Sequence, residues 1–124
     1  MKAYQPLAIL ALLAACDTTP PTGGELFQAN CASCHGTDAR GGVMLDAPNL
    51  TTLAARRGGV FPTAFIMSQV DGFTRDATHG AMPEFGGLLG GELETWTDAN
   101  GVPTPTPAAL IRLAEYLEGL QVAG

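Results

Sequence analysis

The sequence lacks the features that would place it in several common classes of protein. Its 124 residues contain no apolar run of about 20 residues, the length that a helix needs to cross a bilayer. Six basic residues stand against twelve acidic ones, so the formal net charge is −6. This balance argues against nucleic acid as a partner, because such binding needs basic surfaces. There are two histidines and no evident Ser/His/Asp or paired-carboxylate pattern, so neither an enzyme nor a small-molecule substrate is expected.

The first fifteen residues have the pattern of a bacterial export signal. Lys2 provides a positive start, and residues 6–15 (PLAILALLAA) form an apolar stretch that is typical of a signal peptide. This stretch ends in L-A-A-C at Cys16, which resembles a lipobox, and the resemblance implies cleavage before Cys16 and lipidation of its thiol. We therefore expect a signal peptide over residues 1–15 and a lipidated N-terminus with a short tether over residues 16–22. The alternative is a plain secretory signal that contains a cysteine.

The two remaining cysteines lie in the pentapeptide C-A-S-C-H, over residues 31–35, which is the attachment signature for haem c. Residues three apart on a helical turn point to the same side, so Cys31 and Cys34 can both reach the vinyl groups along one porphyrin edge. His35 then turns its imidazole toward the iron as the proximal ligand. The motif occurs once, which predicts one covalent haem.

Three other interpretations of these cysteines compete with haem attachment. A redox-active C-x-x-C pair is usually found near a βαβ pattern, which is missing here. A zinc site needs a second pair of ligands, and His79 alone cannot supply it. A disulfide between Cys31 and Cys34 remains open for a chain to which no haem is attached.

From Gly23 to the C-terminus the sequence resembles the class I c-type cytochromes. The resemblance implies an all-α fold over residues 23–124, in which about 3–5 short helices and long loops surround one haem. Gly23 and Phe27 match the small and aromatic pair by which the family's N-terminal helix crosses its C-terminal helix, where Tyr116 would complete the contact.

The helices themselves can be expected from local patterns. Thr22 and Glu25 have the spacing of a capping box, which predicts a helix that leads into the cysteine motif. Near the C-terminus, Thr106 and Pro107 suit an N-cap and a first helical position. The apolar stripe that follows predicts a core-facing helix with Gly119 near its end; it consists of Leu110, Leu113, Leu117 and Leu120. A short buried helix after Pro62 is indicated by Phe65, Ile66 and Val70.

The resemblance also implies how both faces of the haem are covered. The segment D-A-P-N-L resembles the family's proline loop, in which the Pro48 carbonyl would accept the Nδ1 proton of His35 and Leu50 would cover the haem. The segment H-G-A-M-P resembles the family's Met-Pro loop, so we expect Met82 as the sixth iron ligand. His79 is the alternative, and it would give a lower reduction potential.

Several other residues are candidates for a role at the haem. Met44 falls in the expected proximal loop, and Met67 falls in a helical apolar pattern where core packing is the default. One or two of the arginines could pair with the haem propionates, since a planar guanidinium suits a carboxylate; the candidates are Arg40, Arg56, Arg57 and Arg75.

The chain departs from compact family members between Met82 and Pro107. This stretch is rich in turn formers and contains the single tryptophan, Trp96, so we expect a long loop over residues 86–106. It could cover the haem, fill space, or form a docking surface.

Together these features predict an electron carrier rather than an enzyme. We expect a monohaem cytochrome that faces the periplasm, is held on the cell envelope through Cys16 (with the inner membrane favoured), and exchanges single electrons with redox protein partners. Two alternatives stay open. The chain could be a haem subunit of a larger oxidoreductase, or a five-coordinate haem sensor or peroxidase-like protein.

Overall fold

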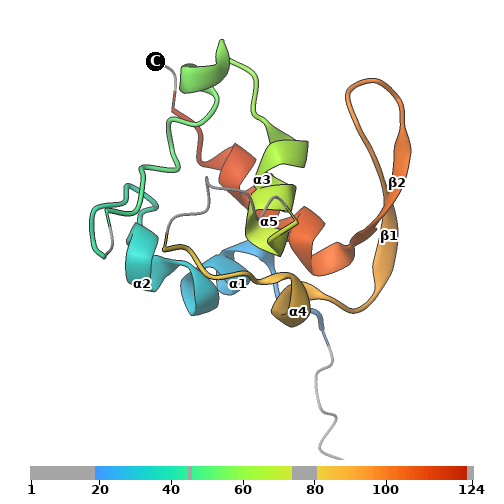
Figure 1. Cartoon of the computed structure of the whole chain (residues 1–124), viewed down its shortest axis with the longest axis horizontal. Coiled ribbons are helices and arrows are strands. Elements are labelled where there is room, and N and C mark those ends of the chain that lie inside the picture. Colours follow the sequence, from blue (N-terminus) through green and yellow to red (C-terminus); the bar gives the residue numbers. More distant parts are fainter. Residues whose placement is uncertain (1–18, 45, 74–80, 123–124) are drawn as a thin grey trace, which may run out of the picture.

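The computed structural model describes residues 19–44, 46–73 and 81–122 (Figure 1). In chain order the elements are α1 Gly23–Asn30, α2 Ala32–His35, the 3-10 turn η1 Ala55–Arg57, α3 Thr63–Asp71, α4 Gly86–Leu89, β1 Leu93–Thr97, β2 Pro103–Pro107 and α5 Ala108–Gly119. The fold is mostly helical, as the sequence predicts, with a small two-stranded sheet added near the C-terminal end.

The first helix begins where the capping box predicts. The Thr22 hydroxyl accepts a hydrogen bond from the Glu25 backbone N–H at 3.2 Å, and the Glu25 carboxylate accepts one from the Thr22 backbone N–H at 2.7 Å. Two of the backbone donors that a helix leaves without partners are satisfied in this way.

Helices α1 and α5 cross at close range, and this crossing is the centre of the fold. A side chain at Gly23 would overlap the backbone carbonyl oxygen of Arg112, so only glycine lets the two backbones approach this closely. One turn later the fully buried Phe27 packs against Tyr116, with ring centroids 5.6 Å apart. The predicted crossing contact is therefore confirmed.

Helix α3 completes the core by packing against α5. The stripe on α5 is buried at Leu110, Leu113 and Leu117 and half-buried at Leu120; α3 contributes Ile66, Met67 and Val70. Met67 is a core residue, as its helical pattern indicates. Phe65 was expected to be buried with them, but 41% of its surface is exposed.

The start of α5 differs from the predicted one. Thr106 is not an N-cap: its hydroxyl donates to the Thr104 carbonyl at 3.1 Å, and α5 begins at Ala108 with Pro107 in the N-cap position. The reason is that residues 103–107 form a strand. Thr106 pairs with Glu94 in this strand and so lies one residue before the N-cap position.

The strands β1 and β2 form an antiparallel hairpin within the stretch that was expected to be a loop. Leu93 lies opposite Pro107, and Thr97 lies opposite Pro103. Asp98 closes the turn, its carboxylate accepting the backbone N–H groups of Val102 and Asn100, each at 2.8 Å. These hydrogen bonds, that of Val102 first, hold the pKa of Asp98 below its ordinary value.

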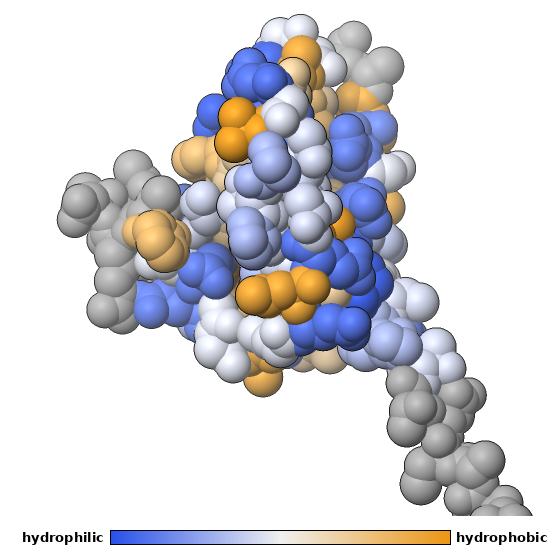
Figure 2. Space-filling model, turned by 90° about the vertical axis from the view of Figure 1, so that its right-hand side faces the viewer, coloured by the Kyte–Doolittle hydropathy of each residue, from blue (hydrophilic) through white to orange (hydrophobic). Residues whose placement is uncertain are grey.

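The hairpin projects from the body on the side opposite α2 in the view of Figure 1. Figure 2 looks onto this side and shows small apolar patches among mainly hydrophilic residues. The exposed apolar residues of this region include Leu88, Leu93 and Val102. Trp96 is half-buried and packs against the core, which fastens the hairpin to the body.

Candidate haem site

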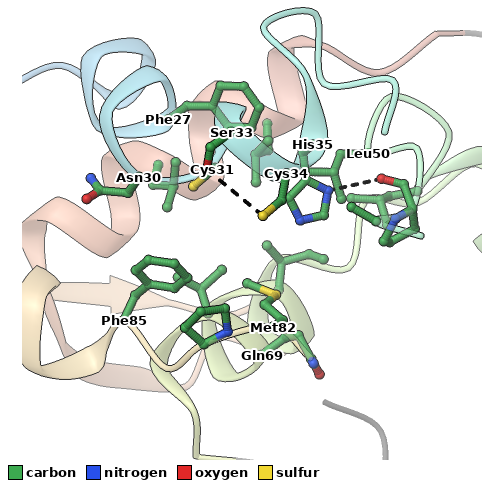
Figure 3. Close-up of a pocket in the computed structure, with 18 of the residues that line it drawn as sticks. Phe27, Asn30, Cys31, Ser33, Cys34, His35, Leu50, Gln69, Met82 and Phe85 are labelled. Carbon is green, nitrogen blue, oxygen red and sulfur yellow. Dashed lines mark hydrogen bonds between the residues drawn. The ribbon is translucent and has the colours of Figure 1, made fainter. Parts of the chain in front are cut away.

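A cavity of about 930 Å³ opens between the helices and the loops that connect them. It is large enough for a cofactor, since ligand cavities in proteins span about 300–1,000 Å³. Most of its wall is apolar, from residues such as Phe27, Leu50, Ile66, Val70 and Leu113. Figure 3 shows the cysteine motif on one side of this cavity and Met82 with Phe85 on the other.

The cysteine motif forms a single helical turn directly after α1. Cys31 is the C-cap of α1, and its carbonyl accepts the backbone N–H of His35 at 2.9 Å, which closes the turn of α2. Cys31 and Cys34 are both half-buried free thiols that line the cavity. The turn therefore presents both sulfurs and the imidazole to the same cavity.

The chemistry of Cys31 does not suit a redox-active dithiol. Burial, and secondarily the neighbouring Cys34, raises the pKa of the Cys31 thiol to about 11. Reactive cysteines have lowered pKa values, because the thiolate is the nucleophile. A zinc site finds no support either: in the described ranges, no group of three or more His, Cys, Asp and Glu side chains is arranged to hold a metal ion.

His35 is buried, with 7% of its surface exposed, and its orientation is fixed by one hydrogen bond. Its Nδ1 lies 3.1 Å from the carbonyl oxygen of Pro48. A carbonyl can only accept, so Nδ1 carries the proton in this contact and Nε2 keeps a free lone pair. That lone pair is the one a metal would use, and the hydrogen bond increases its basicity.

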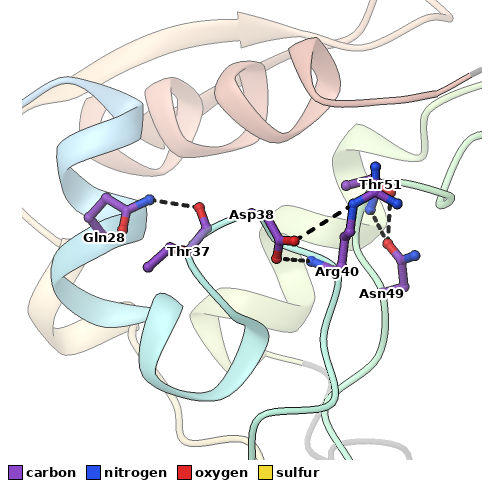
Figure 4. Close-up of polar contacts among 6 residues, drawn as sticks. All are labelled: Gln28, Thr37, Asp38, Arg40, Asn49 and Thr51. Carbon is purple, nitrogen blue, oxygen red and sulfur yellow. Dashed lines mark hydrogen bonds and ion pairs between the residues drawn. The ribbon is translucent and has the colours of Figure 1, made fainter.

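The loop that carries Pro48 is ordered by its own polar groups. The Asn49 side-chain oxygen accepts the backbone N–H and the hydroxyl of Thr51, both at 2.8 Å (Figure 4). The backbone N–H of Leu50 donates to the Ala39 carbonyl at 2.8 Å. These bonds hold the loop beside the segment that follows the cysteine motif. Leu50 lies in the cavity wall next to Pro48.

The segment after the cysteine motif is tied back to α1 as well. The Gln28 side-chain amide donates to the Thr37 carbonyl at 3.1 Å, and Asp38 pairs with Arg40 at 3.7 Å in the exposed turn that follows (Figure 4). The backbone N–H of Gly41 donates to the His35 carbonyl at 2.7 Å. Both the N–H and the carbonyl of the His35 backbone are thus held by hydrogen bonds.

Met82 lies across the cavity from His35 and is half-buried in its wall (Figure 3). Pro83 and Phe85 continue the same wall. Gln69 of α3 also lines the cavity, and its side-chain oxygen is buried with no hydrogen-bond partner among the described residues.

The other predicted residues are less central. Met44 lines the cavity but is 51% exposed, whereas Met67 is buried in the core. Arg56 and Arg57 line the cavity, and Arg40 does not. Cys16, His79 and Arg75 lie outside the described residues.

The sequence did not single out Gln121, which fastens the cavity wall to the C-terminus. Its side-chain N–H groups donate to the carbonyls of Leu50 and Leu117, and its side-chain oxygen accepts the backbone N–H of Ala54 at 2.9 Å. Gly41, which packs against Pro48, was also missed. Gln121 carries no local signal, because its contacts with Leu50 and Ala54 are distant in sequence. The contact of Gly41 depends on how the loop turns back at Pro48.

The residues that line the cavity fit a haem: two free thiols one helical turn apart, an oriented imidazole, a thioether opposite, and an apolar wall between them. This is the arrangement of a monohaem c-type cytochrome. Residues 18–96, more than half of the chain, match the family "Cytochrome C oxidase, cbb3-type, subunit III". The chain belongs to this family, and its cofactor is covalently bound haem c.

Two curated relatives support the same assignment. The chain is 43% identical over 56 residues to the cbb3-type cytochrome c oxidase subunit CcoP of Rhodobacter capsulatus, in an alignment that covers 33% of this chain and 19% of the relative. A CcoP sequence from a particular strain of the same species is 41% identical over 56 residues, with the same coverage. The chain thus spans about a fifth of the length of these relatives. No solved structure gives a significant match.

Proposed function

We propose that the chain transfers single electrons through one haem c held by Cys31 and Cys34, with His35 and Met82 as the axial iron ligands. The observation that carries the proposal is the position of Met82 across the cavity from the cysteine turn (Figure 3). When bound, the haem supplies one-electron chemistry between ferric and ferrous iron, and the protein supplies ligands, a dry pocket and an exposed edge.

The two thiols serve attachment. Cys31 and Cys34 would hold the haem through two thioether bonds, each of which would arise by addition of an S–H across a vinyl group without an oxidant. The half-buried positions of Cys31 and Cys34 fit this role, because a thioether carries no charge and is stable in an apolar wall.

His35 and Met82 would bind the iron from opposite sides of the cavity in both oxidation states. The hydrogen bond from His35 to Pro48 holds the imidazole plane, which reduces the reorganisation that an electron transfer requires. A thioether ligand favours the ferrous state, so Met82 gives a higher potential than His79 would.

The proposal includes a location. We infer that the mature chain begins at Cys16, carries lipid there, and faces the periplasm from the membrane on which it is anchored, because the apolar residues 6–15 and the L-A-A-C segment resemble a lipoprotein signal. In the part of the chain that the structure describes, no helix is long and apolar enough to cross a membrane.

The experiment is to produce the protein in a host that attaches haem c, and to compare the wild type with Met82→Ala. We expect one haem by mass, a Soret band, and in the oxidised protein a near-infrared Met–iron charge-transfer band that disappears in the variant. Met44→Ala is the matched control and should keep the band, since Met44 lies on the exposed rim.

Two results would contradict parts of the proposal. A chain without covalent haem in such a host would refute the site itself. A high-spin spectrum with ready binding of carbon monoxide would refute ligation by Met82 and favour a haem sensor or peroxidase-like protein.

A second function is favoured by the relatives. The family and both relatives are named as oxidase subunits, so the chain could act as a haem subunit within a larger oxidoreductase rather than as a free carrier. Size-exclusion chromatography of a native membrane extract separates the two. The carrier elutes near its own mass, and the subunit elutes with the complex.

A further inference from the structure

Two adjacent arginines stand at the rim of the cavity. Arg56 and Arg57 end the turn η1, and both are exposed side chains that also line the cavity. Among the described residues of the cavity wall they are the two permanent cations, and Asp46 is the one carboxylate. The remaining titratable groups of the wall are His35 and the two cysteines.

The guanidinium of Arg57 is held in place but keeps its hydrogen-bond donors free. It lies over the ring of Phe65, with 4.3 Å between the guanidinium carbon and the ring centroid. The Arg57 backbone N–H donates to the Ala54 carbonyl at 2.9 Å, but among the described residues its guanidinium makes no hydrogen bond and no ion pair. Stacking orients the planar group without using its N–H donors, so all five remain available to a ligand.

The other described arginines are committed elsewhere. Arg56 donates to the carbonyls of Asn49 and Thr52, at 2.7 and 3.3 Å. Arg40 pairs with Asp38 away from the cavity, and Arg112 donates to the Pro21 carbonyl. Arg57 is therefore the described arginine whose guanidinium is oriented, free, and in the wall of the cavity.

We propose that Arg57 binds a propionate carboxylate of the haem, with Arg56 as a second positive charge beside it. The inference rests on the proposed function, since it assumes a haem in this cavity. A carboxylate that enters a largely apolar cavity needs a partner that replaces its lost hydration, and a planar guanidinium can donate two parallel hydrogen bonds to it. The exposed position of Phe65, which sequence reasoning expected to be buried, is explained by this arrangement, because the face of its ring supports Arg57.

This role has a consequence for the redox equilibrium. A positive charge near the haem stabilises the reduced state, which carries one more electron, so loss of Arg57 lowers the midpoint potential. The same charge keeps the pKa of the propionate low. Without this charge the propionate titrates at higher pH. The midpoint potential of the variant then falls with rising pH over a range in which the midpoint potential of the wild type is constant.

The test measures midpoint potential against pH in holoprotein of the wild type, Arg57→Gln and Arg40→Gln. We expect a lower potential and a new pH dependence for Arg57→Gln and neither change for Arg40→Gln, the matched control. Equal potentials and equal pH profiles in the two variants would overturn the proposal. If Arg57→Gln keeps the wild-type Soret band and Met–iron band, equal potentials and pH profiles would refute the propionate contact alone and leave the haem site standing.

Two further measurements complete the design. Asp46→Asn is added to Arg57→Gln, because Asp46 is the other carboxylate of the wall: a pH dependence that persists supports the propionate as its source, and one that vanishes overturns it. If Arg57→Gln does not fold, Arg57→Lys is used, which keeps the charge but not the planar fork. Its propionate bending mode in the resonance Raman spectrum should shift from that of the wild type, and an unshifted mode would count against the contact.

Discussion

Gly41 packs directly against the carbonyl group of Pro48, the group that accepts the hydrogen bond of His35. A Cβ at position 41 would lie 2.7 Å from the Pro48 oxygen and closer still to the Ala47 carbonyl oxygen, and both distances are shorter than side-chain carbons normally allow. Gly41 also has a φ of 78°, in the left-handed region that favours glycine. One glycine thus determines how closely the proximal loop approaches the histidine.

This relationship can be tested with a neighbouring residue as the control. Gly42 has a φ of 75°, but a Cβ there would meet no atom within 4 Å. Gly42→Ala should therefore cost only the backbone strain, about 1 kcal/mol. Gly41→Ala should lose about 1–3 kcal/mol more because it also displaces the Pro48 carbonyl. Chemical denaturation of the holoproteins gives both values. Equal losses would mean that the Gly41 contact does not constrain the loop.

The helix crossing supplies a second prediction, at Gly23. Alanine is normally the better helix former by about 1 kcal/mol, but at Gly23 it would overlap the Arg112 carbonyl oxygen. We expect Gly23→Ala to destabilise the protein by about 1–3 kcal/mol, as overpacked sites do. Gly119→Ala in α5, where a Cβ meets nothing within 4 Å, should be neutral or stabilising in the same thermal unfolding experiment. The opposite order of the two variants would exclude the close crossing.

The capping box predicts a pH dependence of stability. Hydrogen bonds from the backbone N–H and the hydroxyl of Thr22 hold the pKa of the Glu25 carboxyl below its ordinary value of 4.5. A lowered pKa in the folded state means that the stabilisation is fully present above the unfolded pKa and is lost as the pH falls through the folded one. In urea denaturation, the wild type and Glu25→Gln should therefore differ most above the pKa of an unfolded glutamate, and the difference should shrink as the pH falls below it. A difference that is constant with pH would show that the charge of Glu25 is not involved.

The hairpin supplies a prediction about Trp96. Trp96 packs against the core, whereas Thr95 is on the other face of β1 and is exposed. Trp96→Ala should lower the unfolding free energy by roughly 1–3 kcal/mol, which is less than the loss expected when a fully buried tryptophan is truncated. Thr95→Ala should lower it by less than about 0.5 kcal/mol. Haem content and the Soret band should not change in either variant. A loss of haem in Trp96→Ala alone would instead place the hairpin in the support of the haem cavity.

Local patterns were sufficient for much of the helical framework. The capping box at Thr22, the single turn of the cysteine motif and the leucine stripe of α5 each depend on neighbours within about four residues, and such patterns can be recognised in a sequence. The crossing at Gly23 was predicted through the family resemblance, because no local pattern tells which distant helix a small residue will meet.

The hairpin was missed because P-T-P-T-P has the composition of a series of turn formers. The prolines alternate with threonines, and this period of two places Pro103, Pro105 and Pro107 at positions of β2 that donate no hydrogen bond to β1. Proline therefore does not disrupt this ladder. The contacts of Gln121 and Phe65 were missed for another reason: they depend on where the C-terminus and η1 meet the cavity, which only the folded chain determines.

The same alternation makes the two outer edges of the hairpin unequal. Along β2 the outward positions are prolines, which have no N–H group, whereas along β1 they are Leu93, Thr95 and Thr97, which have one each. An additional strand could therefore exchange hydrogen bonds in both directions only with β1, because the outer edge of β2 offers carbonyl acceptors alone. If two copies joined through β1, the product would be a four-stranded sheet with a proline strand at each border, and growth would stop there. Edge-to-edge pairing through this hairpin would therefore end at a dimer and would not continue into a fibre.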